Sequence, residues 1–139
     1  MKRATANAAT GDVLEPLLVE AQLLIAARAL VSRGWCREAA AADRDGVQVA
    51  PTAASACRWS ATGALDAVSH YRRTALRSPE GIEAARTRAL LALAAVVGDV
   101  ESWNRSPERT QADVLAALED ALALVERLPD ARSSEGVPP

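Results

Sequence analysis

Two cysteines and one histidine are the residues of this chain best suited to metal binding or nucleophilic chemistry. A structural zinc site needs four Cys or His ligands, and a catalytic zinc site needs three ligands and a water. Cys36, Cys57 and His70 stand at unrelated spacings, so the sequence predicts no metal and no cofactor. Free cysteine is among the most buried residue types. We therefore expect both cysteines in the core, with a redox or nucleophilic thiol, or a bridge between the two, as the alternative.

The single histidine lacks the partners that acid–base catalysis requires. A general base must lie within hydrogen-bond reach of the proton that it takes. Asp66 precedes His70 by four residues, which places both side chains on one face of a helix. This spacing favours an ion pair or a helix-end contact over catalysis.

The segment around Trp103 is the strongest candidate for a binding site. Asn104 follows it with an amide, and Arg105 and Arg109 add two guanidinium groups. Guanidinium forks suit anions, as do the free N–H groups at the start of a helix. The predicted ligand-binding residues are Trp35, Cys36, Trp103, Asn104, Arg105 and Arg109. The alternative is that Trp103 fills the core and Asn104 makes a local turn bond.

The most basic stretch of the chain spans residues 72–88. Its cations are Arg72, Arg73, Arg77, Arg86 and Arg88. Glu80 and Glu83 partly offset this charge, and the formal net charge of the whole chain is −2. No aromatic residues are interleaved for base stacking. We interpret the stretch as solvated helix faces, with phosphate or nucleic-acid contact as the alternative.

Helices must position these residues, because apolar side chains recur at helical spacing along most of the chain. The predicted helices cover about 13–33, 53–74, 78–98 and 110–129. Gly34 is expected to end the first helix in the left-handed conformation, and Pro129 is expected to end the last. A capping box is expected at Thr110 and Asp113. The predicted fold is all-α, a bundle of about four main helices with a short irregular or hairpin-like insertion at 35–51.

The core must consist mainly of Ala, Leu and Val, because the chain has no Phe and three Trp. Trp35, Trp59 and Trp103 each stand where a helix is expected to begin, end or turn. A Trp side chain buries on the order of 150–250 Å². We therefore expect the three rings to fill the space where helices meet, with the Trp59 ring packed over Gly63.

The chain has the length of one domain. We expect a disordered N-terminus at 1–11, a single helical domain at 12–129 and a disordered tail at 130–139. The basic start is not followed by a long apolar run, so no signal peptide is expected. The longest apolar stretch is 89–97, which is too short to span a membrane. These features and the two unpaired cysteines predict a cytoplasmic protein without membrane contact.

Three ordered motifs resemble a family of small uncharacterised bacterial and phage proteins, a domain-of-unknown-function family. The motifs are Gly34-Trp35-Cys36-Arg37, then Arg58-Trp59-Ser60-Ala61-Thr62-Gly63-Ala64-Leu65, and then Trp103-Asn104 with Arg109-Thr110. The resemblance covers most of residues 20–128. In the family the second motif usually has Cys where this chain has Ser60, which argues against a paired-thiol site. The resemblance implies a fold but no activity.

The main functional hypothesis follows from what the sequence lacks. It contains no recognisable nucleophile–base pair, no set of metal ligands and no phosphate-binding loop. The sequence predicts a non-enzymatic accessory or interaction protein that binds a macromolecular partner, most simply a protein, through a helical face. Homodimerisation through the leucine seam of the last helix is a further hypothesis. The alternatives are a ligand-binding protein or enzyme with a polar site near Trp35 and Trp103, and a nucleic-acid-associated regulator that uses the arginines of 72–88.

Overall fold

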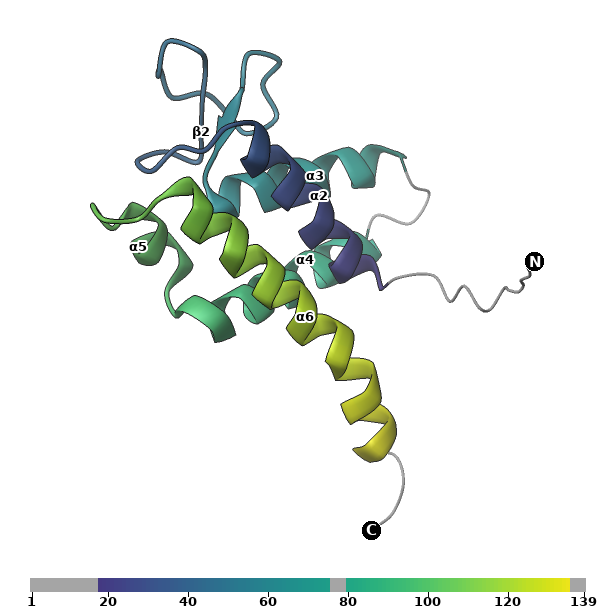
Figure 1. The fold of residues 1–139 in the computed structure, drawn as a ribbon. Coiled ribbons are helices and arrows are strands. Elements are labelled where there is room, and N and C mark those ends of the chain that lie inside the picture. The colour runs from purple at the N-terminus through teal and green to yellow at the C-terminus, as the bar shows by residue number, and fades with distance from the viewer. Residues whose placement is uncertain (1–17, 76–79, 136–139) are drawn as a thin grey trace, which may run out of the picture.

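The computed structural model describes residues 18–75 and 80–135. Its helices are α2 (Val19–Arg33), α3 (Ala61–Ala75), α4 (Glu80–Val97), α5 (Val100–Arg105) and α6 (Gln111–Glu135). The predicted all-α bundle is confirmed, since four main helices pack together and α5 is a single short one (Figure 1). The predicted helix start near residue 13 and the cap at Ser78 lie outside the described residues, as does the 1–11 segment.

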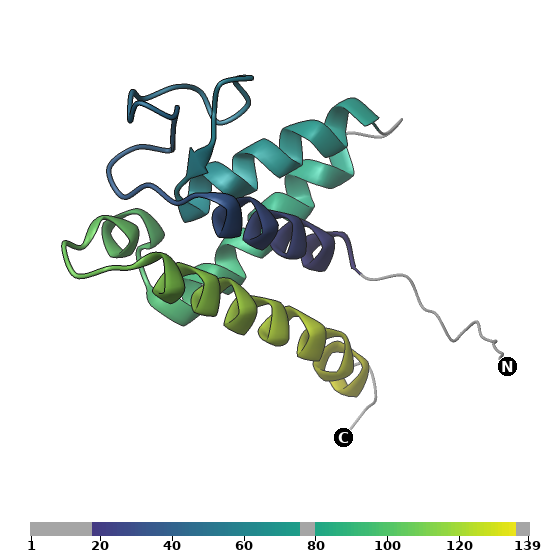
Figure 2. The same ribbon diagram turned by 45° about the horizontal axis from the view of Figure 1, so that its top comes forward.

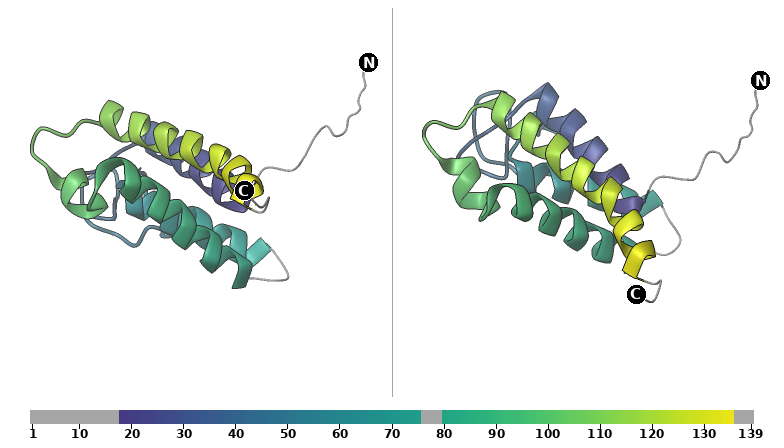
Figure 3. Two further views of the ribbon diagram at one scale, coloured as in Figure 1. Left: turned by 90° about the horizontal axis from the view of Figure 1, so that it is seen from below. Right: turned by 60° about the horizontal axis from the view of Figure 1, so that its bottom comes forward.

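The bundle has two layers. α2 and α6 lie together in one layer, and α3 and α4 form the other (Figure 3). The largest fully buried side chains are Leu23, Leu24, Leu65, Ile82, Leu93 and Leu118, and most of the remaining core residues are alanine or valine. Small side chains at the contacts let helix axes approach closely. The predicted Ala-, Leu- and Val-rich core is therefore confirmed.

Two predicted helix boundaries are confirmed. The Thr110 N–H donates to Asp113 Oδ2 at 3.1 Å, and the Asp113 N–H donates to Thr110 Oγ1 at 3.2 Å. These reciprocal bonds form a capping box at the start of α6. At the end of α4, Gly98 has a φ of 85° and donates its N–H to the Ala94 carbonyl at 2.8 Å. Glycine adopts this left-handed conformation without steric cost.

The insertion is longer than predicted. It occupies residues 34–60 at one end of the bundle, rather than 35–51 (Figure 2). The strands β2 (Ala41–Ala42) and β3 (Arg58–Trp59) pair antiparallel, with Ala41 opposite Trp59. Asp43 closes the turn after β2, because its Oδ1 accepts from the N–H groups of Asp45 and Val47, both at 2.9 Å. The hairpin-like character is thus confirmed.

The predicted start of the second helix at residue 53 is wrong, because α3 begins at Ala61. Residues 57–60 are held extended by backbone bonds to the chain that follows α2. Cys57 donates its N–H to Ala42 at 2.9 Å, and Trp59 donates to Gly34 at 3.0 Å. These long-range bonds outweigh the helix propensity of the alanines just before it, Ala53, Ala54 and Ala56.

Gly34 and Gly63 serve close backbone approach. Gly34 has a φ of −179°, which is extended, so the predicted left-handed cap is wrong. A Cβ on Gly34 would lie 2.2 Å from the Cys57 carbonyl oxygen. A Cβ on Gly63 would lie 1.8 Å from the Ala40 carbonyl oxygen. The backbone of Ala40 therefore covers Gly63, which corrects the prediction of a Trp59 ring over a helical glycine.

Each tryptophan lies at a junction, as predicted, but their burial differs. Trp59 is 4% exposed, and its Nε1 donates to the Pro51 carbonyl at 3.0 Å. Trp35 and Trp103 are half-buried and pack against the edge of the core. Trp59 is therefore the ring that closes the core beneath the insertion.

The predicted end of the last helix at Pro129 is wrong, because α6 continues to Glu135. A proline removes its own N–H and clashes with the preceding turn, which bends a helix at a cost of about 3 kcal/mol. The helix resumes with Ala131 and Arg132, which are strong helix formers. Residues 130–135 are thus helical rather than part of a disordered tail, and 136–139 lie outside the described residues. The assignment of 12–129 to one domain stays a prediction. None of the described helices is both long enough and apolar enough to cross a membrane.

Ser69 offers a test of the core. Its Oγ is fully buried and has no hydrogen-bond partner in the described part of the chain. An unsatisfied buried hydroxyl destabilises a fold by about 1–3 kcal/mol, so Ser69→Ala is expected to stabilise the protein by about 1 kcal/mol in urea unfolding. Ser32→Ala is the matched control, because Ser32 Oγ is exposed and donates to the Ala29 carbonyl at 2.7 Å. Equal effects of the two substitutions would contradict the prediction.

Candidate functional site

Asn104 on α5 connects the residues that the sequence grouped as a binding site. Its Oδ1 accepts from Trp35 Nε1 at 3.0 Å and from the Ala61 N–H at 3.2 Å. Its Nδ2 donates to the carbonyls of Cys36 and Arg37, both at 3.2 Å. The side chain is 2% exposed, and an amide makes at most about four such bonds. The structure therefore brings Trp35, Cys36 and Asn104 together, but the Asn104 amide is fully used by the fold.

Arg37 is a member of this junction that the sequence analysis missed. Its Nε donates to the Ser106 carbonyl at 3.1 Å, and its Nη2 donates to the Arg109 carbonyl at 2.7 Å. The guanidinium carbon lies 5.1 Å from the centre of the Trp35 ring. Arg37 thus ties the insertion to the turn between α5 and α6. The only sequence signal was its place beside Gly34-Trp35-Cys36, because its partners lie about 70 residues away.

Arg109 is also held by the fold. Its guanidinium carbon lies 4.1 Å from the centre of the Trp103 ring, and its Nε donates to the Trp103 carbonyl at 2.8 Å. Its Nη1 lies 3.8 Å from Asp113 Oδ2. Arg105, by contrast, is exposed and forms no ion pair with the described residues. Of the two arginines in the predicted site, only Arg105 has a guanidinium group available to a ligand.

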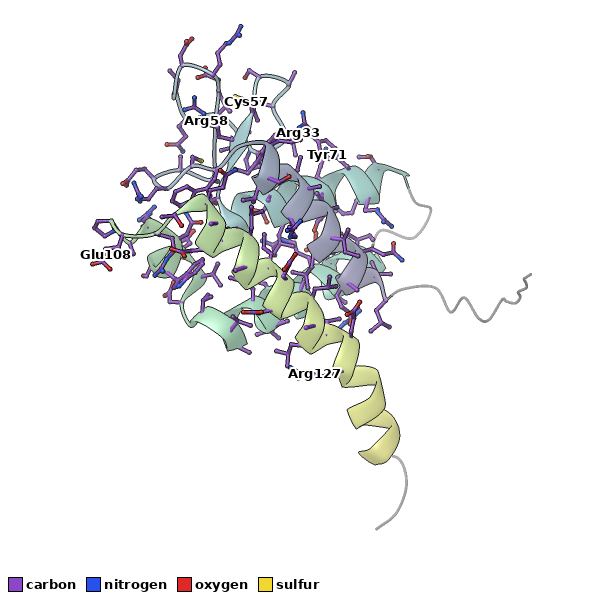
Figure 4. All side chains as sticks on the ribbon, in the orientation of Figure 1. Arg33, Cys57, Arg58, Tyr71, Glu108 and Arg127 are labelled. Atoms are coloured by element: carbon purple, nitrogen blue, oxygen red, sulfur yellow. The ribbon has the colours of Figure 1, made fainter. Side chains whose placement is uncertain are left out.

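The cysteines do not form a reactive pair. Cys36 Sγ donates to the Ala39 carbonyl at 3.0 Å, and burial raises the pKa of this thiol. A raised pKa lowers the thiolate fraction at neutral pH, and the thiolate is the nucleophile. Both cysteines are free and half-buried, so the prediction that they lie in the core is wrong, and Cys57 lies in the insertion (Figure 4). Among residues 18–75 and 80–135, no three Cys, His, Asp or Glu side chains are grouped so that they could hold a metal ion.

Asp66 pairs with Arg86, not with His70. Arg86 Nε donates to Asp66 Oδ1 at 2.7 Å, so the expected ion pair between Asp66 and His70 is wrong. His70 is exposed and instead contacts the edge of the Tyr71 ring. No orienting acid or nucleophile accompanies the histidine among the contacts of the described chain.

Salt bridges neutralise most of the basic stretch. Arg73 pairs with Glu83, and Arg88 Nε lies 3.1 Å from Oε2 of the buried Glu20. With the Asp66–Arg86 pair, three of its four described arginines have a carboxylate partner. Arg77 lies outside the described residues. Paired guanidinium groups attract phosphate weakly, so this stretch is a poor electrostatic surface for nucleic acid.

A cleft of about 170 Å³ lies beside Asn104. It is bounded by the insertion, by the first two turns of α3, by α4 and by α5. Its charged and polar lining includes Arg37, Thr62, Asp66, Arg86, Glu101 and Arg105. The cleft is the place where the predicted site residues Asn104 and Arg105 meet side chains from other elements.

The outer face of α4 is a second candidate surface. Leu91 is 63% exposed and Val96 is 37% exposed. Ala84, Thr87 and Ala95 are also exposed along this helix, and the charged residue between them on the same face is Arg88, which pairs with Glu20. The inner side of the same helix packs against α2, α3 and α6. A helix that is apolar on most of its sides is normally covered on most of its sides.

Comparison with known proteins gives a family and no activity. The model of one family, described as a family of unknown function (DUF6197), matches residues 15–124. No curated protein and no solved structure matches the chain.

Proposed function

The chain belongs to the DUF6197 family of unknown function, and we propose that it is a non-enzymatic interaction protein that binds another protein through the outer face of α4. The observation that carries the proposal is the exposure of Leu91 on a helix that has no charged residue from Ala89 to its end at Val97. Contiguous exposed apolar surface on a soluble domain is typical of interaction sites.

The chemistry of the partner follows from the charge of this face. Arg88 is the cation on this face and Glu20 neutralises it, while Leu91, Val96 and the exposed alanines are apolar, so an apolar helix or groove of a protein fits better than nucleic acid. The paired arginines at 73, 86 and 88 support the same choice. A reducing, cytoplasmic location fits the two free cysteines, and the sequence resemblance favours a bacterial or phage source.

The junction around Asn104 supports a non-enzymatic role. Asn104 and Arg109 direct their polar side-chain atoms to backbone groups or to other side chains of the same chain. Such groups stabilise the position of α5 and the insertion. They are not free to polarise or protonate a substrate.

Leu91→Glu is the test of this function. Since Leu91 is largely exposed, the substitution should change the free energy of unfolding by no more than about 0.5 kcal/mol. A carboxylate in the centre of an apolar interface should reduce binding at least tenfold. The measurement is affinity capture from the cells that produce the protein, with nuclease present, followed by mass spectrometry and a titration with the purified partner.

Val47→Glu is the matched control, because Val47 is 59% exposed but lies in the insertion. The proposal expects the same partner with the wild type and with Val47→Glu, and its loss with Leu91→Glu. Equal capture by all three proteins would overturn the assignment to α4. A second copy of the chain as the partner would appear as a dimer in sedimentation that Leu91→Glu dissociates.

A further inference from the structure

The cleft beside Asn104 is lined by charges of both signs. Arg37 lines it with a guanidinium group that is fixed by two carbonyls and has no carboxylate partner among the described residues. Arg105 adds a second cation, which is likewise unpaired there. Of the lining carboxylates, Glu38 and Glu101 have no ion pair with the described residues, and Asp66 uses one carboxylate oxygen for Arg86.

We propose that this cleft binds a small zwitterion, of the class of the α-amino acids, with its carboxylate toward Arg37 and Arg105 and its ammonium group toward Glu101 and Asp66. Guanidinium groups bind carboxylates through charge-assisted hydrogen bonds, and carboxylates accept in the same way from ammonium. The site is independent of the α4 face, because neither Leu91 nor Val96 lines the cleft.

The volume of the cleft limits the size of the ligand. Pockets for drug-sized ligands have about 300–1,000 Å³, so a cleft of about 170 Å³ suits a smaller molecule. Glycine, alanine and serine are the smallest α-amino acids.

The mixed charge of the lining selects against simpler ions. A small anion would meet the carboxylates of Glu38, Asp66 and Glu101, and a small cation would meet Arg37 and Arg105. A ligand with both charges is complementary to both kinds of group. Thr62 also lines the cleft, and its hydroxyl can donate to a carboxylate or accept from an ammonium group.

The test is a titration of the full chain with alanine, acetate and methylamine, followed by isothermal calorimetry and by NMR. Alanine is expected to bind saturably, and acetate and methylamine at least tenfold more weakly. Arg105→Ala and Glu101→Gln should each weaken alanine binding at least tenfold, since each removes one charge from the cleft. Arg127→Ala is the control, because Arg127 is exposed on α6 away from the insertion and α5 (Figure 4).

Three results would overturn the proposal: no saturable binding of alanine or of the related amino acids glycine and serine at millimolar concentration, acetate binding as strong as alanine binding, or equal effects of Arg105→Ala and Arg127→Ala. Leu91→Glu should bind alanine like the wild type. Loss of the protein partner with retained alanine binding therefore separates a defect at α4 from a defect in the cleft.

Discussion

Gly63→Ala is expected to destabilise the protein by about 3 kcal/mol or more, although alanine is the better helix former. The new Cβ would lie 1.8 Å from the Ala40 carbonyl oxygen and 2.7 Å from the Ala40 carbonyl carbon. Both atoms belong to the backbone, so no side-chain rotation relieves the overlap. Either α3 or the insertion must move, and the backbone bond between the Ser60 N–H and the Ala40 carbonyl, 3.0 Å long, would be strained with it.

Gly81→Ala is the matched control for Gly63. Gly81 also lies within a helix, α4, but a Cβ there meets nothing within 4 Å. The gain in helix propensity should stabilise the protein by about 0.5 kcal/mol. Urea unfolding of both variants measures the difference, and loss of folded Gly63→Ala protein counts as agreement. A Gly63→Ala variant as stable as Gly81→Ala would mean that Ala40 does not cover α3.

Asn104→Ala is expected to cost about 3–5 kcal/mol of stability. The substitution leaves Trp35 Nε1 and the Ala61 N–H without their acceptor, and the carbonyls of Cys36 and Arg37 without their donor. Each buried polar group that loses its partner costs about 1–3 kcal/mol, and water from the cleft can satisfy some of the four. The measurement is again the free energy of unfolding in urea.

Gln111→Ala is the control for Asn104, because Gln111 also connects distant segments through an amide. Its Nε2 donates to the Val31 carbonyl at 2.7 Å and to the Ser32 carbonyl at 3.4 Å. The Val31 carbonyl also accepts from the Gly34 N–H at 3.1 Å, so it keeps a partner after the substitution. We expect a loss of about 1 kcal/mol or less. Equal losses of stability at the two positions would show that the hydrogen bonds of Asn104 stabilise the fold no more than those of Gln111.

The local features of this protein were predictable from its sequence. Apolar residues at helical spacing predicted the four main helices, and the short-range signals at Thr110 and Gly98 predicted two of their ends. The turn at Asp43 is local as well, because its carboxylate accepts from the N–H groups of Asp45 and Val47. In each case the stabilising bonds join residues within about four positions of each other, so the information is contained in a short stretch of sequence.

Tertiary contacts decided the features that the sequence did not determine. Residues 57–60 form a strand rather than a helix because their backbone bonds go to residues 34–42. Gly34 and Gly63 are small because a distant backbone lies against each of them, and not because of their own φ angles. The conformational propensities of neighbouring residues contain no information about either of these backbone contacts.

For the candidate site, too, some features were predictable from the sequence and others depend on tertiary contacts. The sequence alone selected Trp35, Cys36, Trp103, Asn104, Arg105 and Arg109 by residue type. Only the tertiary structure decided that the polar atoms of Asn104 and Arg109 are taken by the fold, while Arg105 remains free beside a charged cleft. The physical reason is that these hydrogen bonds join residues up to about 70 positions apart. Their formation depends on how the helices pack and not on the order of residues around each one.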